Sequence, residues 1–331
     1  MHQLNKAIRI LDKVGVFSRW TNVVGLTALF LMIILTFVDV VMRYIFNHPL
    51  EGQTDLTEVM MIVAIFLAVA HTQNEKGHIS IDLITTKLAP KARIAMEFIT
   101  TLLGLGTFVI VIWRTLVQAM WDVNVNAWHR MQMPIPKAPF DAIIALGCTT
   151  LCLLLLRDLL ANAAEARRLG LTWYHWLLML GVPILILVLA IFWMQPTLWQ
   201  LSLPTVGVIG AVFCLILFLV GMPISFALIL TSLLFIGHIR GFDPMLNIVG
   251  ADVYQSVGSW QWAVLPFFVL MGYFCLFARF GEDLYLAAYR WFGHLRGGLA
   301  IATVGACSGF AVSLVTLFRQ PPPWEAWLCH R

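Results

Sequence analysis

The chain has 331 residues, of which 60% are hydrophobic and only 11% charged, with a formal net charge of +4. Soluble domains usually carry about 25% charged residues, so this composition excludes an ordinary water-soluble protein. Residues 169–239 contain no Asp, Glu, Lys or Arg. As one helix they would extend roughly 107 Å, more than three times the ~30 Å core of a bilayer. The chain is therefore predicted to cross a membrane several times.

The first half of the chain predicts four membrane spans with both ends in the cytoplasm. The spans are expected at residues 20–38, at 56–72, from 98 past 113, and at 142–156. Lys and Arg cluster before the first span, between the second and third, and after the fourth, and basic loops stay cytoplasmic. The loops near residue 50 and at 121–139 are therefore expected in the periplasm. The alternating stretch 79–88 is expected along the cytoplasmic interface.

The second half predicts four more spans, which makes eight in all. A fifth span is expected at 173–194, and residues 201–220 and 224–239 are interpreted as two antiparallel spans. One long kinked helix is the alternative, but Pro223 interrupts a helix and the adjacent Gly221 permits a tight reversal. The remaining expectations are a span at 262–278, a surface-lying amphipathic helix at 279–296, and a small-residue segment at 297–312 that re-enters the membrane.

A charged pair marks the end of the first span. Asp39 and Arg43 are four residues apart, so they share a helix face, and charges at membrane depth are usually paired. The simplest interpretation is an interface pair at a helix end. The pair belongs to a longer motif, since residues 39–52 read DVVMRYIFNHPLEG. A second motif follows at residues 77–83, which read GHISIDL. The candidate motif residues here are Asp39, Arg43, Asn47, Glu58, Gly77, His78 and Asp82.

Residues 15–165 resemble the small membrane subunit of the tripartite ATP-independent periplasmic (TRAP) transporters. That subunit shows a D-V-x-x-R-Y-x-F-N-x-P-L element after its first helix and G-H-x-x-x-D-L after its second. From residue 204 onward the chain resembles the beginning of the large subunit of the same transporters. The matching stretches are 219–228 (LVGMPISFAL), 265–272 (LPFFVLMG) and 293–300 (GHLRGGLA). The candidate permease residues are Gly221, Pro223, Pro266, Gly297, Gly298, Ser308 and Gly309.

The resemblance implies an all-α polytopic membrane protein of the bacterial inner membrane. Its expected parts are a four-helix domain (1–165), a connector with one transmembrane helix (166–200) and an N-terminal permease segment (201–313). That segment would hold about three helices and part of a re-entrant hairpin. The resemblance also implies a sodium-driven permease for organic anions such as carboxylates. The implied partners are a periplasmic substrate-binding protein and the rest of the large subunit. No bound cofactor or metal site and no nucleic acid are expected.

The last 18 residues, 314–331, depart from the family pattern and include Arg319, Glu325 and three consecutive Pro at 321–323. We interpret them as a frameshifted tail that truncates the large-subunit segment, so the chain alone is expected to be inactive. A non-transporting membrane scaffold or docking protein is the alternative function. A b-type haem and a membrane enzyme are disfavoured. The histidines lie near helix ends, and Glu58, Glu97, Arg114 and Asp122 form no catalytic triad.

Overall fold

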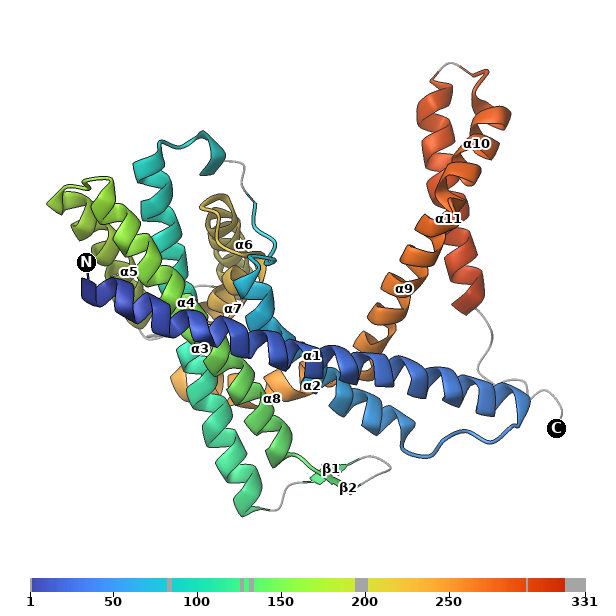
Figure 1. The fold of residues 1–331 in the computed structure, drawn as a ribbon, viewed down its shortest axis with the longest axis horizontal. Coiled ribbons are helices and arrows are strands. Elements are labelled where there is room, and N and C mark those ends of the chain that lie inside the picture. The colour runs from blue at the N-terminus through green and yellow to red at the C-terminus, as the bar shows by residue number, and fades with distance from the viewer. Residues whose placement is uncertain are drawn as a thin grey trace. The chain divides into compact units, whose positions relative to one another are not determined.

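A computed structural model describes residues 2–81, 85–125, 128–130, 134–193, 202–295 and 297–318. The described chain is almost entirely helical, apart from a two-stranded antiparallel hairpin that pairs β1 (Trp128–Arg130) with β2 (Pro134–Pro136). Two compact units divide the chain, Met1–Ala263 and Val264–Arg331 (Figure 1). This confirms the prediction of an all-α polytopic membrane protein.

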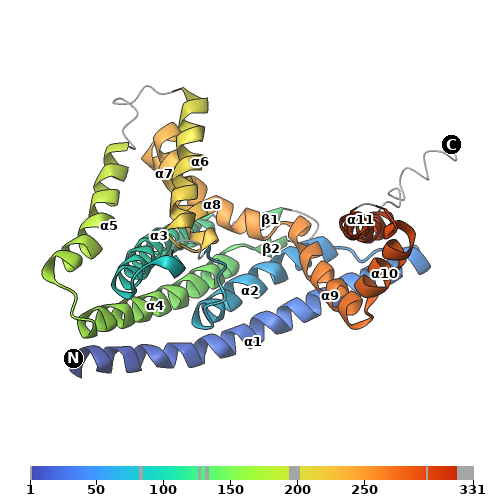
Figure 2. The same cartoon turned by 90° about the horizontal axis from the view of Figure 1, so that it is seen from above.

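Four long helices form the first part of the first unit: α1 (His2–Ile45), α2 (Gln53–Asn74), α3 (Pro90–Asn124) and α4 (Ala138–Arg168), with a 3-10 turn η1 (Thr85–Lys87) before α3. They confirm the four predicted helices and extend each of them. The basic leader and the first span are one continuous helix of 44 residues, in which no Pro interrupts the backbone hydrogen bonds. Figure 2 shows α1 running alongside α2 and α4.

Two glycines let these helices approach closely. A Cβ added at Gly25 would lie 2.9 Å from the carbonyl oxygen of Ala64, and one added at Gly147 would lie 2.2 Å from that of Phe66. Small residues at membrane helix interfaces allow backbones to come into contact, where van der Waals packing holds them together. Gly25 therefore marks the crossing of α1 with α2, and Gly147 the crossing of α4 with α2.

The first unit continues through α5 (Trp173–Trp193), α6 (Leu203–Leu219), α7 (Ile224–Arg240), α8 (Phe242–Val257) and η2 (Trp260–Ala263). Helices α6 and α7 are antiparallel, since Gly210 near the start of α6 packs on Phe235 near the end of α7. The ring of Phe213 lies 6.1 Å from that of Phe235, between centroids. Two antiparallel helices, and not one long kinked helix, are therefore the correct interpretation of this segment.

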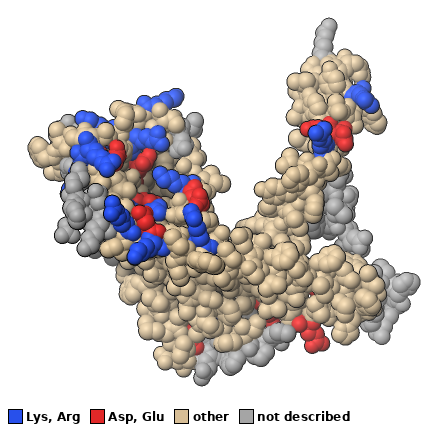
Figure 3. All heavy atoms as spheres, in the orientation of Figure 1, with Lys and Arg blue, Asp and Glu red and all other residues tan. Residues whose placement is uncertain are grey.

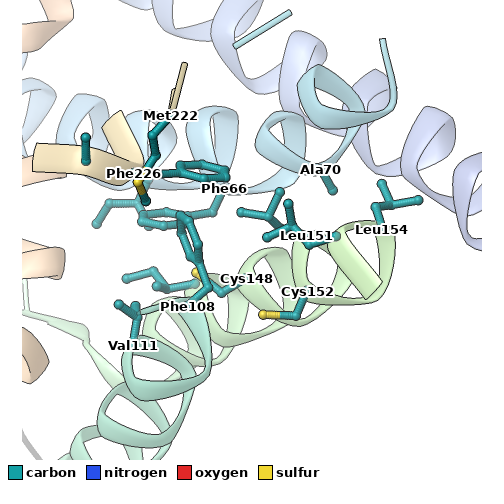
Figure 4. Close-up of a cluster of buried hydrophobic side chains, with 14 of the residues drawn as sticks. Phe66, Ala70, Phe108, Val111, Cys148, Leu151, Cys152, Leu154, Met222 and Phe226 are labelled. Carbon is teal, nitrogen blue, oxygen red and sulfur yellow. The ribbon is translucent and has the colours of Figure 1, made fainter. Parts of the chain in front are cut away.

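A buried apolar core joins the four-helix part to α6, α7 and α8. Phe66 from α2, Phe108 from α3 and Cys148 from α4 pack in one cluster with Met222 and Phe226 of the α6–α7 region (Figure 4). Three of these side chains, Cys148, Met222 and Phe226, are at most 2% exposed. The segments on either side of the connector thus share one hydrophobic core.

The second unit contains α9 (Val264–Phe277), α10 (Phe280–Phe292) and α11 (Gly298–Phe318). Helix α10 coincides with the predicted amphipathic helix, and its position at a membrane surface stays a prediction. Gly297, at the turn before α11, has φ +81°, a conformation that favours glycine. From Gly298 onward, the predicted re-entrant segment 297–312 lies in one continuous helix that runs to Phe318.

Within the described residues, four helices are long and apolar enough to span a membrane, or five if the bent pair Phe242–Val257 and Gln261–Phe277 counts as one span. The predicted total of eight is not reached by this criterion. Helices α6 and α7 have 17 residues each, which is about 25 Å and shorter than a bilayer core of about 30 Å. Helix α8 was not predicted as an element at all.

Lys and Arg gather at one end of the first unit. On the face shown in Figure 3 they lie around the start of α1 and α3 and the end of α4, and the apolar middle is free of them. This is the end expected in the cytoplasm from the loop charges.

Candidate functional site at the helix junction

The predicted pair at the end of the first helix is present. Arg43 Nη2 donates to Asp39 Oδ2 at 2.7 Å, and the backbone N–H of Leu50 donates to Asp39 Oδ1 at 2.9 Å. Asp39 is 3% exposed, whereas the Arg43 side chain is 46% exposed. The carboxylate therefore ties the end of α1 to the loop that leads into α2. Asn47, exposed and with φ +53°, forms the turn between them.

Replacing Arg43 by Ala is expected to destabilise the fold, because a buried carboxylate would lose its cationic partner. The coupling to Asp39 should be about 1 kcal/mol, since solvent screens the half-exposed Arg43. A double-mutant cycle of Arg43→Ala and Asp39→Ala, read by thermal unfolding and by the yield of assembled complex, measures it. Strictly additive losses would show that the two residues are not coupled.

The motif around Gly77 and His78 and the motif around Gly221 and Pro223 meet at one place. The backbone N–H of Ile224, at the start of α7, donates to the carbonyl of Ile79 at 3.0 Å. The His78 ring lies 5.1 Å from the Phe226 ring, between centroids. Gly221 has φ +87°, and a Cβ there would lie 2.6 Å from the Thr85 methyl carbon. The Gly-His loop after α2 (Gly77 and His78) therefore packs directly on the Gly-Met-Pro turn (residues 221–223) between α6 and α7. This contact is called the junction below.

Phe226 is the central side chain of this contact. It is 2% exposed, and its ring meets the Phe108 ring edge-on at 4.9 Å between centroids. Gly104 provides the space for it, because a Cβ at that position would lie 2.8 Å from the Phe226 ring. Figure 4 shows Phe226 reaching from the α6–α7 region toward Phe66 and Phe108 of the four-helix part. Pro223 places Phe226 by ending the turn and serving as the N-cap residue of α7.

A polar pocket of about 370 Å³ opens beside this contact. It lies between the loop after α2, the start of α3, the end of α4 and the α6–α7 turn. Gln73 Nε2 donates to Asp158 Oδ2 at 2.9 Å, and Arg93 Nε donates to Glu97 Oε1 at 3.0 Å. The lining residues that carry charge or a polar group include Gln73, Lys76, His78, Ser80, Thr85, Arg93, Glu97, Thr100, Thr101, Asp158 and Asn162.

His78 is a neutral side chain at this junction. Burial disfavours its charged form and lowers its pKa from the usual value of 6.5. Between the lowered pKa and about 6.5 the unfolded chain binds more protons than the folded one, so stability rises with pH in that window. The junction should therefore weaken as the pH falls through 6.5. The difference in melting temperature between the wild type and His78→Gln should shrink on acidification, and a pH-independent difference would contradict this assignment.

The other predicted residues are placed separately. Glu58 is buried in α2, at 5% exposure. Pro266 lies in the first turn of α9. Gly297 lies at the turn before α11, Gly298 is the first residue of α11, and Ser308 and Gly309 lie within that helix, all in the second unit. Asp82 lies outside the described residues.

Sequence reasoning missed two polar features that lie away from this junction. Arg114 of α3 donates through Nε to the carbonyl of Leu246 at 2.8 Å and through Nη2 to the side chain of Asn247, which attaches α8 to α3. Asp141, at the start of α4, is 1% exposed. In the described part of the chain no group of three or more His, Cys, Asp or Glu side chains is arranged to hold a metal ion. The arrangement is suited to holding helices together.

Comparison with known proteins gives two consecutive matches. Residues 32–165 match the family described as tripartite ATP-independent periplasmic transporters, DctQ component, and residues 209–313 match the DctM component. The chain is 28% identical over 145 residues to a protein described as a TRAP transporter small permease protein in Haemophilus influenzae, covering 44% of this chain and 81% of that protein. It is 33% identical over 95 residues to the C4-dicarboxylate TRAP transporter large permease protein DctM of Rhodobacter capsulatus, covering 29% of this chain and 21% of that protein.

Proposed function

We propose that this chain, which belongs to the tripartite ATP-independent periplasmic transporters, is a membrane component of a sodium-driven permease for organic anions such as carboxylates. It joins a small-subunit segment to a large-subunit segment in one polypeptide. The observation that carries the proposal is the junction. The Gly-His loop of the first segment contacts the Gly-Met-Pro turn of the second through the Ile224–Ile79 hydrogen bond and the His78–Phe226 ring contact. A contact between two motif regions supports a joint role in one transport complex.

The remaining components follow from the family. A periplasmic binding protein would deliver the anion, and the rest of a large permease subunit would supply the transport pathway. The match to the large permease relative covers only 21% of that protein's length. Irregular backbone at membrane depth, of the kind that binds ions and substrates in transporters, needs surrounding protein or a water-filled cavity. We therefore assign the 331 residues a supporting role and no transport activity on their own.

Reconstitution into proteoliposomes tests this assignment. Vesicles with the chain, its binding protein and a separately expressed large permease subunit should accumulate a labelled C4-dicarboxylate under an inward sodium gradient. Vesicles lacking any one component should not. Uptake by the chain and binding protein alone would refute the supporting role, and equal uptake under a potassium gradient would refute sodium coupling. A large subunit that co-purifies with the chain but shows no chain-dependent uptake would favour the scaffold alternative.

We also propose that the N-terminus and the 157–172 loop are cytoplasmic and that the 121–139 loop is periplasmic, from the Lys and Arg asymmetry of the loops. Alkaline phosphatase fused after Asn126 should be active, because the enzyme matures only in the periplasm. The same fusion after Ala164, beyond the fourth helix, should be inactive. Equal activity at both positions would contradict a four-helix first segment.

A further inference from the structure

The polar pocket beside the junction carries charges of both signs that the proposed transport function does not use. Its volume of about 370 Å³ lies within the range of roughly 300–1,000 Å³ that small-molecule sites occupy. Lys76 and Arg93 supply its positive charges, and Glu97 and Asp158 supply its negative charges. The pocket as a whole is close to neutral, so it fits a ligand that also carries both signs.

The two carboxylates are held in place and can accept further hydrogen bonds. Asp158 Oδ1 accepts from Arg157 Nη2 at 2.8 Å, and Asp158 Oδ2 accepts from Gln73 Nε2 at 2.9 Å. Glu97 Oε1 accepts from Arg93 Nε at 3.0 Å. A carboxylate has about four acceptor positions, so both groups can still accept from the ammonium group of a ligand.

The two cations can still donate hydrogen bonds. Lys76 has φ +50° where α2 ends, and its backbone N–H donates to the Gln73 carbonyl at 3.0 Å, which fixes its position beside the pocket. Among the described residues its ammonium group has no ion-pair partner. Arg93 contacts Glu97 through Nε, so its Nη groups are left to donate to a ligand. Together they offer several charged donors to an anionic group.

The pocket lies at the border between charged helix ends and apolar spans. Arg93 and Glu97 are near the start of α3, and no charged residue follows from 98 to 113. Leu155, Val220 and Phe226 add apolar surface to the same pocket. This is the end of the first unit where Lys and Arg gather (Figure 3). Basic pockets between transmembrane helices at the cytoplasmic side are sites where phospholipid headgroups bind.

The mixed charges select among headgroups. A phosphate accepts charge-assisted hydrogen bonds from Lys and Arg, and a primary ammonium donates them to carboxylates. The quaternary ammonium of choline has no N–H to donate. The glycerol headgroup of phosphatidylglycerol carries no positive charge, so the two carboxylates would repel the lipid's net negative charge. Phosphoethanolamine satisfies both halves of the pocket.

We propose that this pocket binds the headgroup of one phosphatidylethanolamine molecule, with the phosphate on Lys76 and Arg93 and the ammonium on Glu97 and Asp158. The bound lipid contacts the loop after α2, helices α3 and α4, and the α6–α7 turn. It therefore joins the small-subunit segment to the large-subunit segment beside the junction. A ligand that binds only the folded state stabilises it, so the lipid stabilises this packing. The site does not depend on the proposed sodium-driven transport.

Native mass spectrometry of the detergent-purified chain tests the proposal. The chain is mixed with equal amounts of phosphatidylethanolamine, phosphatidylcholine and phosphatidylglycerol that carry the same acyl chains. One phosphatidylethanolamine per chain should be retained with a preference of about tenfold over each of the other lipids, since hydrogen bonds to charged groups are the strong ones. A large molar excess of water-soluble glycerophosphoethanolamine should not displace it, because the apolar surface of the pocket also contacts the lipid.

Four variants test the assigned contacts. Lys76→Gln should lower the retention of phosphatidylethanolamine about tenfold, and Lys76 is exposed, so the core is not disturbed. Glu97→Gln should raise the retention of phosphatidylglycerol to that of phosphatidylethanolamine, because one repelling charge is removed. Lys91→Gln and Glu165→Gln are the matched controls, since both residues are exposed and lie outside the pocket lining. Both controls should keep the wild-type preference.

Three results would overturn the proposal. The first is equal retention of the three lipids by the wild type, which needs no variant to fold. The second is displacement of the lipid by glycerophosphoethanolamine, which would make the ligand a soluble phosphate ester and not a lipid. The third is an unchanged preference for phosphatidylethanolamine in both Lys76→Gln and Glu97→Gln, which would place the lipid elsewhere on the chain.

Discussion

Gly147→Ala is expected to destabilise the chain by about 2–3 kcal/mol, at the upper end of the usual cost of overpacking. The added Cβ would lie 2.2 Å from the carbonyl oxygen and 2.8 Å from the carbonyl carbon of Phe66, well inside van der Waals contact. Both atoms belong to the backbone of α2, so no side-chain rotation relieves the clash. Helices α2 and α4 must move apart, and the core around Phe66 must loosen with them.

Gly106→Ala is the matched control, because a Cβ there meets nothing within 4 Å. In a helix this change should be neutral or stabilising by up to about 1 kcal/mol. Thermal unfolding of both variants in the same detergent measures the difference. A melting temperature for Gly147→Ala equal to that of Gly106→Ala would contradict the close contact between α2 and α4.

Gly104→Val is expected to separate α7 from α3. A Cβ at Gly104 would lie 2.8 Å from the Phe226 ring, and that ring is confined by Phe108 on one side and His78 on another. Phe226 must leave its pocket, which exposes apolar surface on both sides of the junction. Loss of a buried Phe typically costs about 3–5 kcal/mol, so the second segment should detach while the first remains folded.

Gly106→Val serves as the control, since it adds the same side chain to the same helix at a position where a Cβ meets nothing within 4 Å. Cleavage at a protease site introduced between α5 and α6, followed by size-exclusion chromatography, reports whether the two segments stay attached. The fragments should stay together in the wild type and in Gly106→Val and separate in Gly104→Val. Co-elution of the Gly104→Val fragments would show that Phe226 does not carry the junction.

The regular parts of the fold could be predicted from the sequence. Long uncharged runs bordered by Lys and Arg predicted α1 to α4, and the Gly-Met-Pro turn at Gly221 predicted the α6–α7 hairpin. Both predictions succeeded because each signal lies in a short stretch of the sequence. Helix α8 escaped prediction, since Asp243 and Asn247 interrupt its apolar residues and no long hydrophobic run marks it.

The contacts of the candidate site could be predicted only in part. The Asp39–Arg43 pair follows from its spacing of four residues. The meeting of His78 with Phe226 joins positions nearly 150 residues apart, and no local pattern encodes it. Gly104 and Gly106 look alike in the sequence, although only the first faces an aromatic ring.

Disulfide cross-linking across the junction tests most directly the claim that the two family segments pack together. The Ile224 N–H donates to the Ile79 carbonyl at 3.0 Å, so the two backbones are adjacent, and a disulfide spans Cα separations of about 4.4–6.8 Å. The double variant Ile79→Cys with Ile224→Cys, carrying a protease site in the loop between α5 and α6, is oxidised in native membranes and then cleaved. The two fragments should migrate as one band without reductant and as two bands with it, and each single variant should give two bands in both conditions. Separate fragments from the oxidised double variant, in membranes where the uncleaved chain is folded, would contradict the junction.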